Sequence, residues 1–196
     1  MQEKSTRTPN AERRAQMRAR LIEAARAVFL EKGYAEASTP EIVRAAGATR
    51  GALYHHFQDK QALFRAVVEA EAQAVTSAIE TASTSVTKAD ALAVGSRAFF
   101  EAMSDGARAQ ILLVDGPAVL GAAEMDQIDA GGGRQSLLAG LRAAHSNRSE
   151  EELSAMAVVL SAAFDRAALE VAQSGADAEI FEEIMARLMA AALSPS

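Results

Sequence analysis

Two short helical segments separated by a glycine constrain the fold of this chain more than any other feature. The run Ser38-Thr39-Pro40-Glu41 is typical of a helix start, because a hydroxyl accepts from free backbone N–H groups, proline fits the first turn and a carboxylate suits the positive helix end. Gly47 interrupts that helix, and Thr49 offers the N-cap of the next. Two short helices joined by a glycine turn form a helix-turn-helix.

Helical periodicity extends over the rest of the chain. A first helix is expected from Arg13 to Lys32, ended by Gly33, and a long helix starts at Gln58-Asp59-Lys60. Alanine supplies roughly a quarter of the residues and proline is rare, which favours helix throughout. Further helices are expected over these approximate ranges: 89–103, 107–114, 117–130 after a turn at Asp115-Gly116-Pro117, 134–144 after an interruption at Gly131 to Gly133, 149–174 and 178–193. The predicted fold class is therefore all-α.

Composition excludes several classes of protein. The absence of cysteine rules out disulfide frameworks, zinc fingers and thiol nucleophiles. Only His55, His56 and His145 are histidines and no glycine-rich phosphate loop follows a strand, so we expect neither an enzyme nor a cofactor. No long apolar run occurs and the first residues are polar, which predicts a cytoplasmic protein without a membrane contact.

Charge divides the chain into two parts of opposite sign. Residues 1–60 hold 11 Lys and Arg against 7 Asp and Glu, whereas residues 61–196 hold 9 against 19. A basic head on an acidic body suggests that the first part binds a polyanion. We therefore expect a DNA-binding domain over 1–60 and a second helical domain over 61–196.

The first third resembles the DNA-binding domain of the tetracycline-repressor (TetR) family of transcriptional regulators. The residues that carry the resemblance are Leu21-Ile22-Glu23-Ala24-Ala25, Phe29, Lys32-Gly33-Tyr34, Ser38-Thr39, Ile42, Ala45-Ala46-Gly47, Thr49 to Phe57 and Lys60 to Leu63. The run Ile111 to Gly121 also resembles a segment of some ligand domains in this family. The resemblance implies a three-helix DNA-binding domain joined by a long helix to a domain that pairs across a two-fold axis through the last two helices and encloses a small-molecule pocket.

Candidate DNA contacts lie at the start of the second short helix. Recognition helices present their first residues to base edges, here Thr49, Arg50, Gly51 and Ala52. The planar fork of Arg50 matches the two acceptors of guanine. Phosphate contacts are expected from Tyr54, a role carried over from the family, and from His55, Lys60 and Thr39, the last also as a helix cap.

Three further features of the first domain leave alternatives open. Pro40 stands where some family members have a basic residue that can reach a base. Sequence specificity should therefore depend on the second helix and on the basic arm, which carries Arg7, Arg13, Arg14 and Arg18. This arm either follows the DNA or has no sequence-specific role. Adjacent His55 and His56 point apart and lack a third ligand, so no metal is expected. Leu53, Phe57, Phe29 and Ile42 have the spacing of a core.

Large adaptable side chains of the middle helices are candidates for a ligand cavity, although each of them also fits a plain core. They are Phe99, Phe100, Met103, Leu112, Leu113, Met125, Met156, Leu160 and Phe164. The polar groups expected nearby are Asp115, Asp165, Arg166 and Arg97, the last for an anionic ligand. The interruption at Gly131 to Gly133 suits either a helix that moves on ligand binding or a passive loop.

The last two helices have apolar stripes on more than one side. On the final helix Ile180, Ile184 and Leu188 form one stripe, and Phe181, Met185 and Ala192 a neighbouring one. Such width indicates a homodimer interface or complete burial within one subunit. The expected function is a dimeric repressor that a small organic molecule releases from operator DNA; the alternative is a helix-turn-helix regulator whose second domain binds a protein partner instead.

Overall fold

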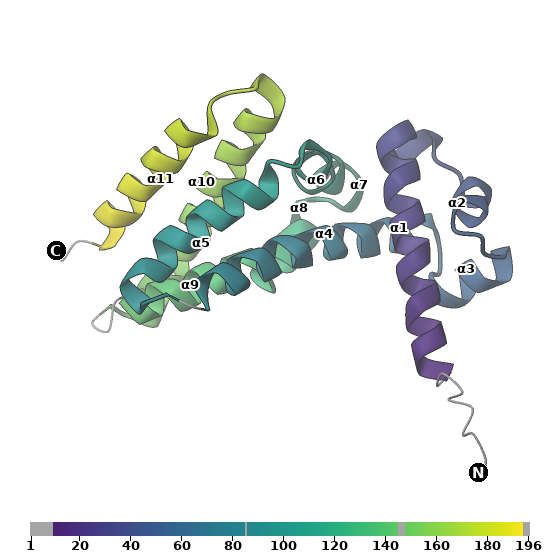
Figure 1. The fold of residues 1–196 in the computed structure, drawn as a ribbon, viewed down its shortest axis with the longest axis horizontal. Coiled ribbons are helices and arrows are strands. Elements are labelled where there is room, and N and C mark those ends of the chain that lie inside the picture. Colours follow the sequence, from purple (N-terminus) through teal and green to yellow (C-terminus); the bar gives the residue numbers. More distant parts are fainter. Residues whose placement is uncertain (1–9, 85, 145–147, 194–196) are drawn as a thin grey trace, which may run out of the picture. The chain divides into compact units, whose positions relative to one another are not determined.

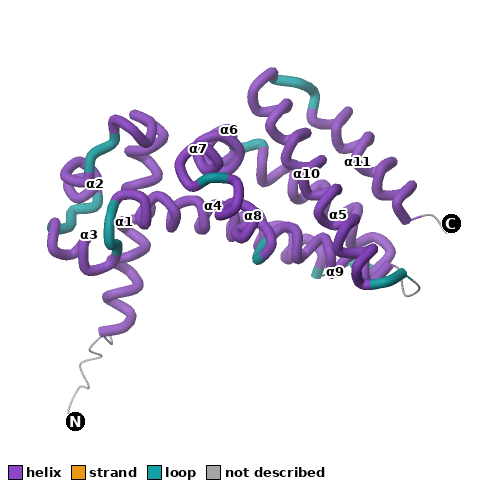
Figure 2. The backbone as a smooth tube through the Cα atoms, turned by 180° about the vertical axis from the view of Figure 1, so that it is seen from behind, coloured by secondary structure: helices purple, strands orange, loops and turns teal. Residues whose placement is uncertain are grey.

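The computed structural model describes residues 10–84, 86–144 and 148–193, and within these residues it contains helices and connecting turns but no strand (Figures 1 and 2). The predicted all-α class is confirmed. The chain forms two compact units that divide between Val67 and Val68, inside helix α4 (Lys60–Ser83). The domain boundary predicted at residue 60 coincides with the start of α4, whereas the two compact units divide within that helix.

The first unit contains α1 (Asn10–Glu36), α2 (Thr39–Ala45), α3 (Arg50–His56) and the start of α4. Gly33 has φ of +76°, so the helical path of α1 is broken after Lys32, as its sequence predicts. The core includes seven large apolar side chains that are at most 5% exposed: Leu21, Phe29, Ile42, Leu53, Phe57, Leu63 and Phe64. This burial confirms the core expected for Leu53, Phe57, Phe29 and Ile42.

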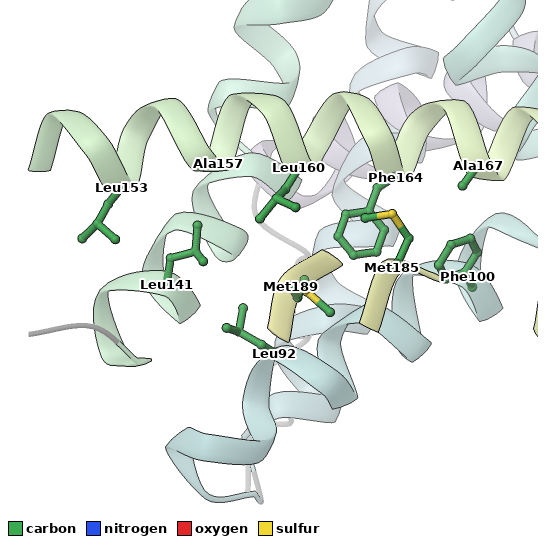
Figure 3. Packing of buried hydrophobic residues seen from close by; sticks show 10 residues of the cluster. All are labelled: Leu92, Phe100, Leu141, Leu153, Ala157, Leu160, Phe164, Ala167, Met185 and Met189. Atoms are coloured by element: carbon green, nitrogen blue, oxygen red, sulfur yellow. The ribbon is translucent and has the colours of Figure 1, made fainter. Parts of the chain in front are cut away.

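The second unit contains the rest of α4 and the following elements: α5 (Lys88–Met103), α6 (Gly106–Ala109), η1 (Gln110–Asp115), α7 (Gly116–Leu120), α8 (Ala122–Ala130), α9 (Gly133–Ala144), α10 (Glu150–Ser174) and α11 (Ala178–Leu193). Helix α10 packs against α9 and α11. Figure 3 shows Leu153, Leu160 and Phe164 of α10 pointing toward Leu141, Leu92 and Met189 of three neighbouring helices. This cluster is the core of the unit.

The predicted turn at Asp115-Gly116-Pro117 is wrong. The chain stays helical there, with a π-helical stretch (η1) directly followed by α7. The ring of a proline collides with the preceding turn of an α-helix, and a wider π turn relieves this collision. The N–H of Gly116 donates to the carbonyl of Ile111, and the helix ends only at Gly121, whose φ is +85°. The interruption expected at Gly131 to Gly133 is present, between α8 and α9.

Candidate DNA-binding surface and effector cavity

The start of α3 presents the residues expected to read bases. Thr49 is the N-cap, and its Oγ1 accepts a hydrogen bond of 3.1 Å from the N–H of Ala52, as predicted. Arg50 and Gly51 are exposed, and Ala52 is half-buried. With Leu53 fully buried beneath them, the first turn of α3 is anchored while its outer side remains free to approach a groove.

Tyr54 joins α2 to α3 on this surface. Its side chain is 47% exposed, and hydrogen bonds from Thr39 of α2 and Arg50 of α3 lower the pKa of its phenol. Both bonds leave the phenolic hydrogen free to donate outward. The structure therefore brings three of the predicted DNA-contact residues into one cluster, which is the arrangement needed for a phosphate contact next to a base contact.

Thr39 differs from its predicted role as a cap, because the N-cap of α2 is Ser38. The carboxylate of Glu41 accepts from the backbone N–H of Ser38 at 3.2 Å and from its hydroxyl at 2.7 Å. Glu41 also pairs with Lys32 of α1, and the bonds from Lys32 and then Ser38 lower the pKa of Glu41 to about 2. Ser38 thus fixes the helix start, and Thr39 is left to bond with Tyr54.

Lys60 is engaged within the protein rather than held out toward a phosphate. Its Nζ donates to the carbonyls of Tyr34 at 2.8 Å, Ala37 at 3.0 Å and Ala35 at 3.3 Å. It also lies 4.4 Å from the centroid of the Tyr34 ring. All three ammonium donors are used on the carbonyls that end α1, so this arrangement favours a structural role for the side chain over the expected phosphate contact.

The histidines and the basic arm occupy different environments. His55 is exposed on α3, whereas burial, and then the charges of His55, Arg14 and Arg18, lower the pKa of His56. The guanidinium of Arg18 lies 5.3 Å from the centroid of the Phe57 ring. Within the described part of the chain no group of three acidic or histidine side chains is arranged to hold a metal. Arg7 and His145 lie outside the described residues.

A cavity of about 580 Å³ lies in the second unit between α4, α5, α8, α9, α10 and α11. The apolar part of its wall includes Ile79, Leu92, Phe99, Leu137, Phe164 and Met189. The polar part consists of hydroxyl, amide and carboxyl groups: Ser83, Thr84, Ser96, Ser136, Ser161, Gln135, Glu80, Asp129 and Asp165. A volume of this order, with an apolar wall and a few convergent polar groups, is typical of a small-molecule site.

Most of the residues predicted for the cavity lie elsewhere. Phe99, Phe164 and Asp165 line it. Four of the others lie in the core or pack against it: Phe100, Met103, Met156 and Leu160. Four lie in the helical segment from η1 to α8: Leu112, Leu113, Asp115 and Met125. Arg97 and Arg166 are exposed at the surface. The prediction selected the largest apolar side chains, and such residues fill a core, whereas a cavity forms where small side chains leave space.

Asp129 and Asp165 form the acidic wall of the cavity. Ser161 donates a hydrogen bond of 2.8 Å to Asp129 Oδ2, and the Nε of Arg134 lies 3.6 Å from the same oxygen. Arg134 also pairs with Asp126 at 2.7 Å, on the exposed side of α8. Burial, and next the charge of Asp129, raise the pKa of Asp165 to about 7, although Arg134 opposes the shift.

Two family models together match most of the chain. The model described as "Bacterial regulatory proteins, tetR family" matches residues 21–67. The model described as "Tetracyclin repressor-like, C-terminal domain" matches residues 89–193, more than half of the chain. The chain belongs to the TetR family. It is therefore a helix-turn-helix DNA-binding transcriptional regulator, in a family of regulators and not of enzymes.

Individual proteins resemble this chain either in sequence over part of its length or in fold over most of it. The HTH-type transcriptional repressor Rv1474c of Mycobacterium tuberculosis is 39% identical over 59 residues, which are 30% of this chain and 32% of that repressor. A TetR-family regulator of Pectobacterium atrosepticum has a crystal structure with a TM-score of 0.67 and 28% identity, over 92% of this chain and 93% of that one. The fatty acid degradation regulator FadR of Bacillus halodurans shares the fold, with a TM-score of 0.72, 15% identity and coverage of 88% and 93%.

The cavity residues that the sequence prediction missed follow a readable pattern. Seven residues of α9 line the cavity, and all but Gln135 and Leu137 are small: Gly133, Gln135, Ser136, Leu137, Ala139, Gly140 and Ala143. Of these, Gly133, Ser136, Gly140 and Ala143 recur at the spacing of one helix face. A Cβ at Gly140 would lie 2.5 Å from Leu92 Cδ2, so the glycine permits the close approach of α5 and α9. Small residues at helical spacing beside a glycine-rich break are the signal that predicts this wall.

Proposed function

We propose that this TetR-family protein is a dimeric repressor that leaves its operator when a small organic molecule fills the cavity. The observation that carries the proposal is the cavity of about 580 Å³ in the second unit of a chain whose first unit is a helix-turn-helix. A tightly filled second unit would favour the alternative of a protein partner. The cavity supports a ligand sensor instead.

The cluster of Thr39, Arg50 and Tyr54 supports the DNA-reading part of the proposal. Arg50 has five N–H donors, so it can bond to Tyr54 and still offer two donors to a guanine. Operator selection with Arg50→Ala tests this assignment. We expect a loss of about 1–3 kcal/mol and a relaxed preference at one base position. An unchanged consensus with Arg50→Ala would remove Arg50 from base readout.

The surface of α10 and α11 supports the dimer. Five apolar side chains are 46–68% exposed there: Val158, Val159, Ile180, Ile184 and Leu188. On α11 the neighbouring stripe faces the core, where Met185 is 2% exposed. A helix that covers its own core with one stripe and exposes another large apolar stripe is typical of a subunit interface.

The proposed mechanism depends on the spacing of two DNA-reading heads. Half-sites about one helical turn apart require a fixed spacing of the two α3 helices in a dimer. Helix α4 contributes Ile79, Glu80 and Ser83 to the cavity wall, and its first residues belong to the DNA-binding unit. A ligand that prefers a different position of α4 therefore shifts the dimer away from the operator-binding spacing.

Fluorescence anisotropy on a selected operator tests the proposal. Candidate ligands are first found by their effect on thermal unfolding, since a ligand at about 100 times its Kd stabilises by about 2.7 kcal/mol. We expect those ligands to weaken operator binding. If every ligand that binds the cavity left operator affinity unchanged, the protein would not be a ligand-released repressor.

A further inference from the structure

We infer that the cavity selects organic cations: a compound with an apolar ring system and one amine that the carboxyl wall recognises. This inference rests on the proposed function, since it names the class of effector for the same cavity. Three carboxyl side chains, Glu80, Asp129 and Asp165, line the cavity, and none of its described lining residues carries a positive charge. A ligand with a carboxylate or a phosphate has no basic partner there.

The carboxyl groups of Asp129 and Asp165 differ in the hydrogen bonds that they accept. Asp129 is occupied on one oxygen by the hydroxyl of Ser161, at 2.8 Å, and by the nearby guanidinium of Arg134. No described residue donates a hydrogen bond to the carboxyl of Asp165, one helical turn after Ser161 on α10. Asp165 is thus a mostly buried acceptor that a ligand N–H group can satisfy.

The charge of Asp165 is poorly compensated without a ligand. Burial and the charge of Asp129 oppose its ionisation, and Arg134 offsets these effects only in part. An ammonium group beside Asp165 supplies the missing positive charge in surroundings where water screens it weakly. The same surroundings disfavour an anion and give a neutral analogue no comparable gain.

The apolar wall defines the rest of the ligand. Phe99 and Phe164 lie with ring centroids 5.1 Å apart, and Phe164 immediately precedes Asp165 in the sequence. Leu92, Leu137 and Met189 complete an apolar surface beside the carboxyl groups. An aromatic body attached to an amine by a short link fits this juxtaposition of rings and charge.

Three probes of matched shape test the inference: 2-(2-naphthyl)ethylamine, 2-(2-naphthyl)ethanol and 2-naphthylacetate. Their affinities for the full chain are measured by calorimetry at about pH 8, where Asp165 is ionised. We expect the amine to bind about tenfold or more tighter than the alcohol, and the carboxylate to bind weakest. Asp165→Asn should abolish the preference for the amine and leave the affinity for the alcohol unchanged.

A matched variant separates the local effect from net charge. Glu151 is an exposed carboxylate in the first turn of the same helix and is not part of the cavity wall, so Glu151→Gln removes one negative charge elsewhere. It should keep the amine preference. The inference is overturned if the alcohol or the carboxylate binds as tightly as the amine, if none of the three binds at about 1 mM, or if Glu151→Gln acts like Asp165→Asn.

The failure of this inference and that of the proposed function are distinguishable. If the amine binds through Asp165 but leaves operator affinity unchanged, the cation site stands and the repressor mechanism fails. If a neutral compound binds in the cavity and releases the operator, the repressor mechanism stands and the cation preference fails.

Discussion

The ammonium group of Lys60 lies 4.4 Å from the ring centroid of Tyr34 and donates to the carbonyl of the same residue at 2.8 Å. It thereby holds the first residue of α4 against the end of α1. The three carbonyls that it satisfies have no other donor among the hydrogen bonds of the described residues. Lys60 therefore contributes to the folding of the DNA-binding unit whatever it does with DNA.

Lys60→Ala should lower the free energy of unfolding by about 2–3 kcal/mol, because it leaves partly buried carbonyls unsatisfied and removes the cation–π contact. Urea unfolding followed by circular dichroism measures this loss. Arg44→Ala, which removes one positive charge from an exposed position of α2, is the control and should change stability by less than about 0.5 kcal/mol. Equal stability of the Lys60→Ala variant and wild type would contradict the structural role.

The pKa values of the two tyrosines of the chain should lie on opposite sides of the ordinary pKa of a tyrosine. Hydrogen bonds from Thr39 and Arg50 lower the pKa of Tyr54, whereas burial, and then the charge of Asp59, raise the pKa of Tyr34. Titration of tyrosinate absorbance should resolve two steps, and Tyr54→Phe should remove the lower one. Thr39→Val should move that lower step upward, since it deletes a donor that favours the phenolate. A single step, or no effect of Thr39→Val, would show that the Thr39–Tyr54 bond is not formed in solution.

The helix-turn-helix was predictable because its determinants are local. Ser38, Gly47 and Thr49 act on backbone groups within a few residues, so their effects can be read from the sequence alone. The role of Lys60 was not predictable in this way. Its acceptors lie more than 20 residues earlier in the chain, at Tyr34 to Ala37, and only the packing of α4 on α1 brings them together.

In the second unit, the residues that line the cavity were likewise only partly predictable from the sequence. Phe99 and Phe164 were predicted to line it, yet equally apolar neighbours such as Phe100 and Leu160 fill the core. Periodicity assigns a side chain to a helix face but does not say whether the space beside that face is filled. That depends on how closely the helices approach one another, as at Gly140, where a Cβ would lie 2.5 Å from Leu92 Cδ2.

Ile184→Glu should dissociate the proposed dimer. Ile184 is 46% exposed between Ile180 and Leu188, so a glutamate there is tolerated in one subunit but places a charge in the proposed interface. We expect dimerisation to weaken by at least about 2 kcal/mol per altered side chain and operator affinity to fall with it. Sedimentation velocity measures the oligomeric state. Ala186→Glu, exposed on a different face of the same helix, is the control and should remain dimeric.

Asp165→Asn should stabilise the protein at alkaline pH but not at acidic pH. The pKa of Asp165 is raised from 3.8 to about 7 in the folded protein, so between these values the folded state binds a proton that the unfolded state has released. Stability from this group is therefore present at low pH and is lost as the pH rises through about 7. At pH 8 burial and the charge of Asp129 oppose the ionised carboxylate, Arg134 offsets them only in part, and ionisation costs at most about 4 kcal/mol.

The neutral amide avoids that cost because it does not ionise. Chemical unfolding of both proteins between about pH 5 and pH 8 measures the effect, with the stability advantage of Asp165→Asn shrinking steadily as the pH falls. Glu151→Gln should follow the pH dependence of wild type, because Glu151 is exposed and away from the cavity. An advantage of Asp165→Asn that stayed constant across this range would mean that Asp165 titrates normally and that the cavity wall is already ionised, which would leave a ligand amine little charge to compensate.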